Sequence, residues 1–172
     1  FTSIIEQYFH VGCDFITANT FEANAVKLKD CNHTVQEIIF AAVAHAREAV
    51  KQCGRQAWVA MDIGPTGKLL RPLGDLDFED AYCAFRDAAV YGEQAGADFI
   101  LIETMSDTYE AKAAILAAKE NTHLPVFVTM VFDERKKLLT GGDMAAAVAM
   151  IEGLGADAVG MSTVPEAIAA SH

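Results

Sequence analysis

Basic residues are scarce in this chain of 172 residues, which has 13 lysines and arginines against 24 aspartates and glutamates. The formal net charge is −11 at pH 7. A nucleic-acid-binding protein needs a basic surface that replaces phosphate counterions, and an anionic membrane surface repels an acidic protein. The composition therefore predicts that the protein binds neither nucleic acid nor a membrane.

Long hydrophobic runs are also missing. A helix that crosses a bilayer needs about 20 consecutive apolar residues, and no run here approaches that length. The chain does not open with a charged segment, an apolar segment and a small-residue cleavage site, so we expect a cytoplasmic protein. It starts at Phe1 and within an amphipathic pattern, from which we expect the natural chain to begin earlier.

Cysteine and histidine give no recognisable catalytic or metal-binding pattern. The four cysteines are too few and too scattered for a disulfide scaffold, and none has a ligand neighbour at short spacing. We expect them to be reduced and mostly buried. None of the five histidines follows a predicted strand, and the sequence has neither a nucleophile elbow nor a dinucleotide-binding glycine motif.

Strand-like and helix-like segments alternate along the whole chain. Short apolar runs predict buried strands, and segments with a period of 3.6 residues predict helices. A Gly, a small residue and an Asp precede three of the strands, with the Gly suited to a left-handed helix end. The predicted strands are 14–18, 58–61, 99–102, 126–130 and 158–161, and the predicted helices are 2–11, 34–52, 77–95, 107–120, 143–154 and 165–171.

This alternation is typical of an α/β fold in which parallel strands are joined by helical crossovers. An open doubly wound sheet and a (β/α)₈ barrel both fit. A complete barrel takes roughly 250 residues. As a barrel, residues 1–172 would form a single incomplete domain with two open strand edges.

Polar residues follow the predicted strands at the edge where both architectures bind ligands. Glu103 comes directly after four apolar residues, so its carboxylate would lie partly desolvated, where it could pair with an ammonium group or accept hydrogen bonds from loop amides. Asp62 is similar, although the Gly64-Pro65 turn allows it to bind its own backbone. Asn19 and Thr20 follow the first strand and could bind a ligand or cap a loop.

The motifs around these residues resemble a known family. They are Thr17-Ala18-Asn19-Thr20-Phe21, the run from Met61 to Leu70, the run from Leu101 to Asp107, and Thr129-Met130-Val131-Phe132-Asp133. Their order and spacing over roughly residues 1–160 resemble the homocysteine-binding methyltransferase domain of cobalamin-dependent methionine synthase.

The resemblance implies a partial (β/α)₈ TIM barrel that covers about strands 2–6. It also implies methyl transfer to the zinc-bound thiolate of L-homocysteine, which gives methionine, with cobalamin as a methyl carrier on another domain. By motif, Glu103 would pair with the homocysteine ammonium group, and Asn19, Asp62 and Thr104 would line the pocket.

Two features depart from that pattern. The family's zinc is held by three cysteines, but Thr163 occupies the first position and the other two fall outside the sequence, as does the glycine motif of strand one. The resemblance therefore implies a fragment without metal ligands. In addition, residues 155–168 resemble a purine nucleoside phosphorylase segment that places a methionine, here Met161, in the base pocket.

Two further hypotheses stay open at this point. The chain could be a non-catalytic binding module whose open edges associate with a second copy or with other domains of the same polypeptide. It could also be a nucleoside-binding α/β protein, based on residues 155–168 alone.

Overall fold

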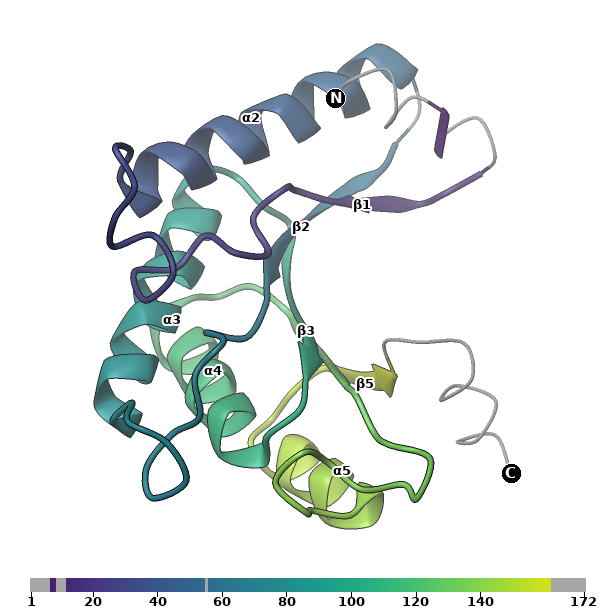
Figure 1. Cartoon of the computed structure of the whole chain (residues 1–172). Coiled ribbons are helices and arrows are strands. Elements are labelled where there is room, and N and C mark those ends of the chain that lie inside the picture. The colour runs from purple at the N-terminus through teal and green to yellow at the C-terminus, as the bar shows by residue number, and fades with distance from the viewer. Residues whose placement is uncertain (1–6, 9–11, 55, 162–172) are drawn as a thin grey trace.

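A computed structural model describes residues 7–8, 12–54 and 56–161. Its five strands are β1 (Phe15–Thr17), β2 (Trp58–Ile63), β3 (Phe99–Met105), β4 (Val126–Met130) and β5 (Ala158–Met161). All neighbouring strands are parallel, and they lie in the order in which they occur in the sequence. Within the described residues no strand joins β1 to β5, so this part of the chain forms an open, curved sheet (Figure 1).

Four helices cover one side of this sheet: α2 (Val35–Cys53), α3 (Phe78–Gln94), α4 (Thr108–Asn121) and α5 (Met144–Gly153) (Figure 1). The sequence prediction of parallel strands with helical crossovers is thus confirmed. The predicted helices 2–11 and 165–171 lie almost wholly outside the described residues.

The helix ends follow local sequence signals. Thr34 and Glu37 form the capping box predicted for α2, and Gly54 ends that helix with a φ of 68°. Asp143 accepts a hydrogen bond from the Ala146 N–H and caps α5. Asp77 precedes α3 as predicted, but its side chain makes no capping hydrogen bond.

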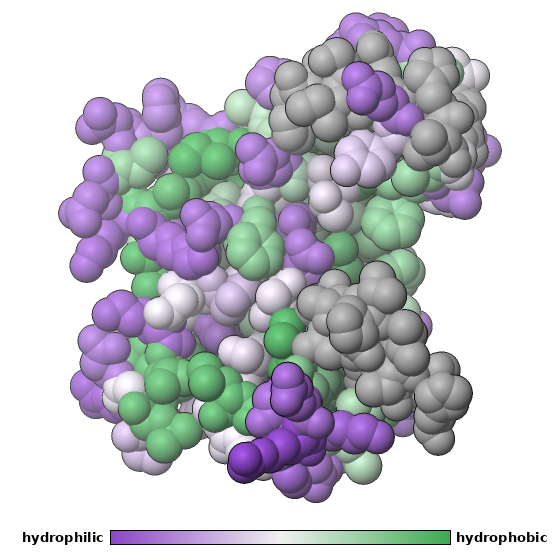
Figure 2. Space-filling view, turned by 45° about the vertical axis from the view of Figure 1, so that its right-hand side comes forward, coloured by the Kyte–Doolittle hydropathy of each residue, from purple (hydrophilic) through white to green (hydrophobic). Residues whose placement is uncertain are grey.

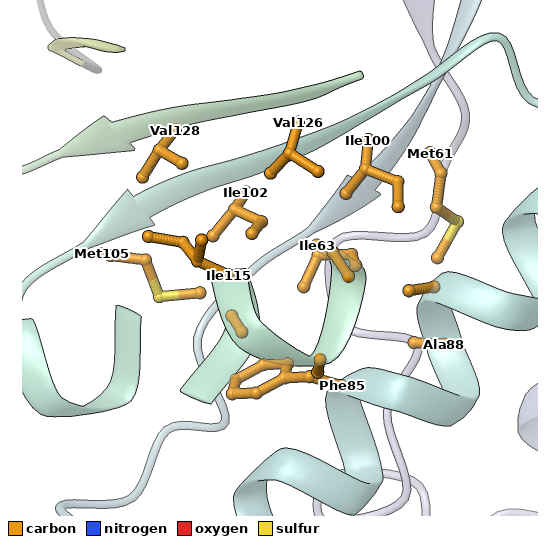
Figure 3. Close-up of a cluster of buried hydrophobic side chains, with 14 of the residues drawn as sticks. Met61, Ile63, Phe85, Ala88, Ile100, Ile102, Met105, Ile115, Val126 and Val128 are labelled. Atoms are coloured by element: carbon orange, nitrogen blue, oxygen red, sulfur yellow. The ribbon is translucent and has the colours of Figure 1, made fainter. Parts of the chain in front are cut away.

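The main core lies between the sheet and the helices. Alternate residues of each strand point toward the helices, because successive side chains of a strand lie on opposite faces. Figure 3 shows Ile63, Ile100 and Ile102 facing Phe85 of α3 and Ile115 of α4. These five side chains are almost completely buried.

The opposite face of the sheet, called the inner face below, carries aromatic rings. The ring of Phe99 contacts those of Phe15 and Phe127, with centroids 5.3 and 4.7 Å apart. Phe15 and its strand neighbour Trp58 are 45% and 48% exposed. Figure 2 shows green, hydrophobic residues at the right of the molecule between the two grey segments.

Two of the repeated aspartates at the strand starts bind neighbouring strands. Asp98 accepts a hydrogen bond from the Val59 N–H at 2.7 Å, and Asp157 accepts one from the Val126 N–H at 2.8 Å. Each therefore joins the start of its own strand to the start of the strand before it. The two aspartates thus have a structural role at the starts of the strands.

Two expectations need correction. Strands β2 and β3 extend past 61 and 102, because Asp62 and Ile63 pair in register with Leu101 and Ile102 and the ladder depends on backbone groups rather than on side-chain polarity. The cysteines are not mostly buried: Cys31 is exposed and the other three are half-buried. In the described part of the chain, no helix is long and apolar enough to cross a membrane.

Candidate functional site

The carboxyl groups of Asp62 and Glu103 form the centre of the candidate site. Both residues lie near the carboxyl ends of adjacent strands, at positions whose side chains point to the inner face, away from the helices. In parallel α/β folds this edge is where ligands bind. The structure thus brings together two of the residues singled out in the sequence.

Asp62 is an unusual carboxyl group. Its residue is only 5% exposed, and its Oδ1 atom has no hydrogen-bond partner within the described residues. Burial, together with the charge of Glu103 and a hydrogen bond to it, raises the pKa of Asp62 to about 8. The described contacts include no bond from the Asp62 side chain to its own backbone, which the sequence allowed; the carboxyl group interacts with Glu103 instead.

The turn after β1 holds the backbone of Asp62 in place. The Thr20 hydroxyl donates to the Asp62 carbonyl oxygen at 2.8 Å and accepts from the Asp62 N–H at 3.0 Å. Thr20 is buried, so its role is structural. Asn19, one residue earlier, is exposed, and none of the described contacts joins it to the carboxyl pair.

A β-bulge sits at Glu103 and Thr104. Ile102 pairs with Val128 and Met105 pairs with Met130. The two residues of β3 are three positions apart, whereas their partners on β4 are two positions apart, so β3 has one extra residue. Thr104 takes up the extra residue with a φ of 61°, a conformation that costs a β-branched side chain energy. Its N–H donates to the Thr129 hydroxyl at 3.0 Å instead of to the backbone ladder. Bulges of this kind redirect side chains beside binding sites.

Thr129 is the site residue that the sequence analysis missed. It appears there within a motif but without a role. The signal that could have found it is alternation, because Asp62, Glu103 and Thr129 are the polar residues at inner-face positions near the ends of three adjacent strands. The bulge that makes Thr129 a partner of Thr104 is not visible in the sequence.

The N-terminus of α4 fixes the loops on both sides of the site. Glu110 accepts hydrogen bonds from the N–H and the hydroxyl of Thr66, in the loop after β2. Asp107 accepts one from the Tyr109 N–H and another from the Thr140 hydroxyl, in the loop after β4. Glu110 and Asp107 are both buried, so these contacts anchor the two loops against α4.

The described residues do not fit a zinc site. No group of three or more His, Cys, Asp or Glu side chains is placed to hold a metal within them. The four cysteines form no disulfide, and none belongs to the carboxyl pair or to the hydrogen-bond partners named for it above among the described residues. Thr163, which stands at the family's first cysteine position, lies outside the described residues.

The fold and the site define an α/β protein with a parallel, curved sheet and an acidic candidate site at the carboxyl edge of its strands. The homocysteine S-methyltransferase family matches residues 2–169, and the chain belongs to that family. This match runs through the segment 155–168, whose likeness to a phosphorylase the sequence left open.

Two relatives are methionine synthases of mycobacteria. The chain is 30% identical over 170 residues to that of Mycobacterium tuberculosis and 28% identical over 170 residues to that of Mycobacterium leprae. Each match covers 93% of this chain and 14% of the relative. The chain thus spans about one seventh of the length of these curated relatives.

Solved structures show the same fold. The homocysteine methyltransferase MmuM from Escherichia coli, in its oxidised and metallated forms, superposes with TM-scores of 0.81 and 0.80 at 18% identity. These matches cover 93% of this chain and 60% and 61% of the MmuM chains. The partial-barrel prediction is therefore confirmed: the five strands described here correspond to part of a larger barrel.

Proposed function

We propose that this chain is the part of a homocysteine S-methyltransferase that recognises the amino-acid end of L-homocysteine. The observation that carries the proposal is the carboxyl pair of Asp62 and Glu103 at the inner-face edge of the sheet. An ammonium group is the ligand that best compensates two neighbouring, desolvated carboxyl groups. Membership of the family supports homocysteine as the bearer of that ammonium group.

In this proposal Glu103 receives the substrate ammonium group, and Asp62 lies directly behind it. Strand alternation points the Glu103 side chain to the inner face, the bulge at Thr104 follows directly, and the bond to Thr129 holds the bulge in place. Asn19 lines the opening of the pocket from the turn after β1. Each residue thereby binds or orients the substrate, and none of them acts on the sulfur.

The reaction proposed is methyl transfer to the sulfur of homocysteine. A carbon–sulfur bond forms, the bond between the methyl group and its donor breaks, and the thiol proton leaves to solvent, which gives methionine. The resemblance to cobalamin-dependent methionine synthase favours methylcobalamin on another domain as the donor. Activation of the thiol by zinc would need ligands from outside the described residues.

The location proposed for the protein is the cytoplasm. The absence of a disulfide among the four cysteines supports a reducing compartment. The whole of residues 1–172 is proposed to form one incomplete domain, since the family match spans residues 2–169.

Calorimetric titration of the full-length protein with L-homocysteine and L-methionine tests the proposal. Replacing Glu103 by Gln should weaken the binding of both about 10- to 100-fold, because a hydrogen bond to a charged group contributes about 1.5–3 kcal/mol. Glu79→Gln is the matched control, since Glu79 is exposed on α3. Equal affinities of the wild type and Glu103→Gln would refute the role of Glu103.

A second candidate function is a binding module that associates through its open sheet. The observation in its favour is the exposure of Phe15 and Trp58 on the inner face, at the edge formed by β1. Gel filtration with light scattering distinguishes the two proposals. A dimer that forms without ligand and dissociates on Trp58→Ser supports the module, and a monomer that binds homocysteine supports the methyltransferase.

A further inference from the structure

We propose that Asp62 and Glu103 hold one proton between them in the ligand-free site, and that the ammonium group of the amino-acid ligand takes the place of this proton. The inference rests on the proposed function and adds to it a role for Asp62. Binding would then be an exchange in which the ligand enters as a cation and one proton leaves to solvent.

The geometry requires the two carboxyl groups to act together. Asp62 pairs in register with Leu101, so Glu103 lies two residues further along the adjacent strand and on the same face of the sheet. Asp62 is 95% buried and keeps one oxygen without a partner within the described residues. A buried carboxyl oxygen that lacks a donor is costly, so it marks a position that a donor occupies in another state.

Among the described residues, no basic side chain is a cause of the raised pKa or a partner of the Asp62 carboxyl group. The titratable group that faces Asp62 from β3 is Glu103. Its negative charge has the same sign as that of an ionised Asp62, so it opposes the ionisation of Asp62. From the turn after β1, the contact with Asp62 is the neutral hydroxyl of Thr20. That loop contains two lysines, of which Lys27 pairs with Glu22 at 2.9 Å. Two like charges in a desolvated site cannot both persist, so one proton stays.

Charge balance explains why an ammonium group suits this site. Before binding, the pair with one proton carries a net charge of −1. After binding, two carboxylates and one ammonium group again give −1, and the released proton goes to the buffer. The site therefore never holds a double negative charge, which a desolvated environment would strongly oppose. An analogue without the amino group cannot replace the proton and should bind poorly.

Calorimetry in buffers of different ionisation enthalpy counts the protons released. The probe is L-methionine, because its thioether has no thiol proton that could be released as well. At pH 6.5 the full-length wild-type protein should release about one proton for each methionine bound. In Asp62→Asn the release should fall to near zero, since the carboxyl group whose proton the ligand displaces is then absent. Asp80→Asn, which changes an exposed residue on α3, should retain the release.

A titration of the ligand-free protein tests the first half of the inference without any ligand. Carboxyl ¹³C resonances assigned to Asp62 should titrate near the pKa of about 8 and not near the ordinary value of 3.8. A midpoint below 5 would overturn the shared proton. This titration uses the wild-type protein, so it tests the shared proton even if Asp62→Asn does not fold.

The two levels of the proposal fail in different ways. Methionine binding without proton release would overturn the exchange and leave the proposed function standing. The absence of binding by methionine and by homocysteine would overturn the proposed function and the exchange with it. If Asp62→Asn releases as many protons on methionine binding as the wild type, Asp62 does not hold the exchanged proton.

Discussion

The carboxylate of Glu110 accepts hydrogen bonds from both the N–H and the hydroxyl of Thr66, a residue 44 positions earlier in the chain. The N–H bond is 2.8 Å long, and both residues are buried. This contact ties the loop after β2 to the first turn of α4. The loop thereby keeps its position beside the carboxyl pair at the end of the same strand.

Removing the Glu110 carboxylate should destabilise the fold. Glu110→Ala leaves two buried donors of Thr66 without an acceptor, so we expect a loss of about 2–3 kcal/mol in the free energy of unfolding. Glu110→Gln keeps an acceptor and should cost about 1 kcal/mol or less. Urea denaturation measures both. Equal losses in the two variants would contradict the hydrogen-bond explanation.

The stability of the protein should fall as the pH rises through the neutral range. Burial and the neighbouring Glu103 raise the pKa of Asp62 to about 8, and burial raises the pKa of Glu110. A carboxyl group with a raised pKa in the folded state contributes stability below its unfolded pKa and loses it as the pH rises through the folded pKa.

Asp62→Asn should flatten this dependence, because the amide resembles the protonated acid. Relative to the wild type, we expect the variant to gain roughly 4 kcal/mol in the free energy of unfolding between pH 5 and pH 8.5, because one pKa unit corresponds to about 1.4 kcal/mol. Thermal or urea unfolding across this range gives the measurement, with Asp80→Asn as the control. Parallel curves for the wild type and Asp62→Asn would argue against a protonated Asp62.

The strained backbone of Thr104 gives a third prediction. Thr104→Gly removes the side chain that opposes a φ of 61°, so we expect a gain of about 0.5–1 kcal/mol in stability. Thr129→Val removes the acceptor of the Thr104 N–H and should cost about 1–2 kcal/mol. Denaturation experiments test both. A stabilising effect of Thr129→Val would show that its hydroxyl does not hold the bulge.

The contact between α3 and β2 leaves no room for a side chain at Gly92. A Cβ atom there would lie 2.5 Å from Cγ and 2.9 Å from Cβ of Met61. Gly92→Ala should therefore destabilise the protein by about 1–3 kcal/mol, although alanine favours helices. Gly153 on α5 offers a matched control, because a Cβ there meets nothing within 4 Å and Gly153→Ala should be neutral or stabilising. A similar effect of both substitutions would contradict the predicted crowding.

Much of the fold can be predicted from the sequence because its signals are local. The capping box of Thr34 and Glu37 and the left-handed Gly54 define α2 almost to the residue. Parallel strands follow from apolar runs that alternate with helices. The lengths of β2 and β3 could not be predicted, since the extra pairs depend on the neighbouring strand and not on side-chain polarity.

The candidate site was predictable only in part. The sequence places Glu103 and Asp62 at strand ends, and the resemblance to the family gives Glu103 a role. The contact between the Glu110 carboxylate and Thr66 has no signal in the sequence. Such a contact joins residues that only the folded chain brings together.

The sequence by itself determined the alternation of strands and helices, the helix ends and the acidic residues at the carboxyl ends of the strands, because these depend on residues within a few positions of one another. Only the tertiary structure decided that Asp62 and Glu103 interact, that Asp62 is buried without a partner for one oxygen among the described residues, and that a bulge at Thr104 bonds to Thr129. These properties arise from strand register and burial. Both depend on contacts between segments that are about 25 to 40 residues apart in the chain, as in the bonds from Thr104 to Thr129 and from Thr20 to Asp62.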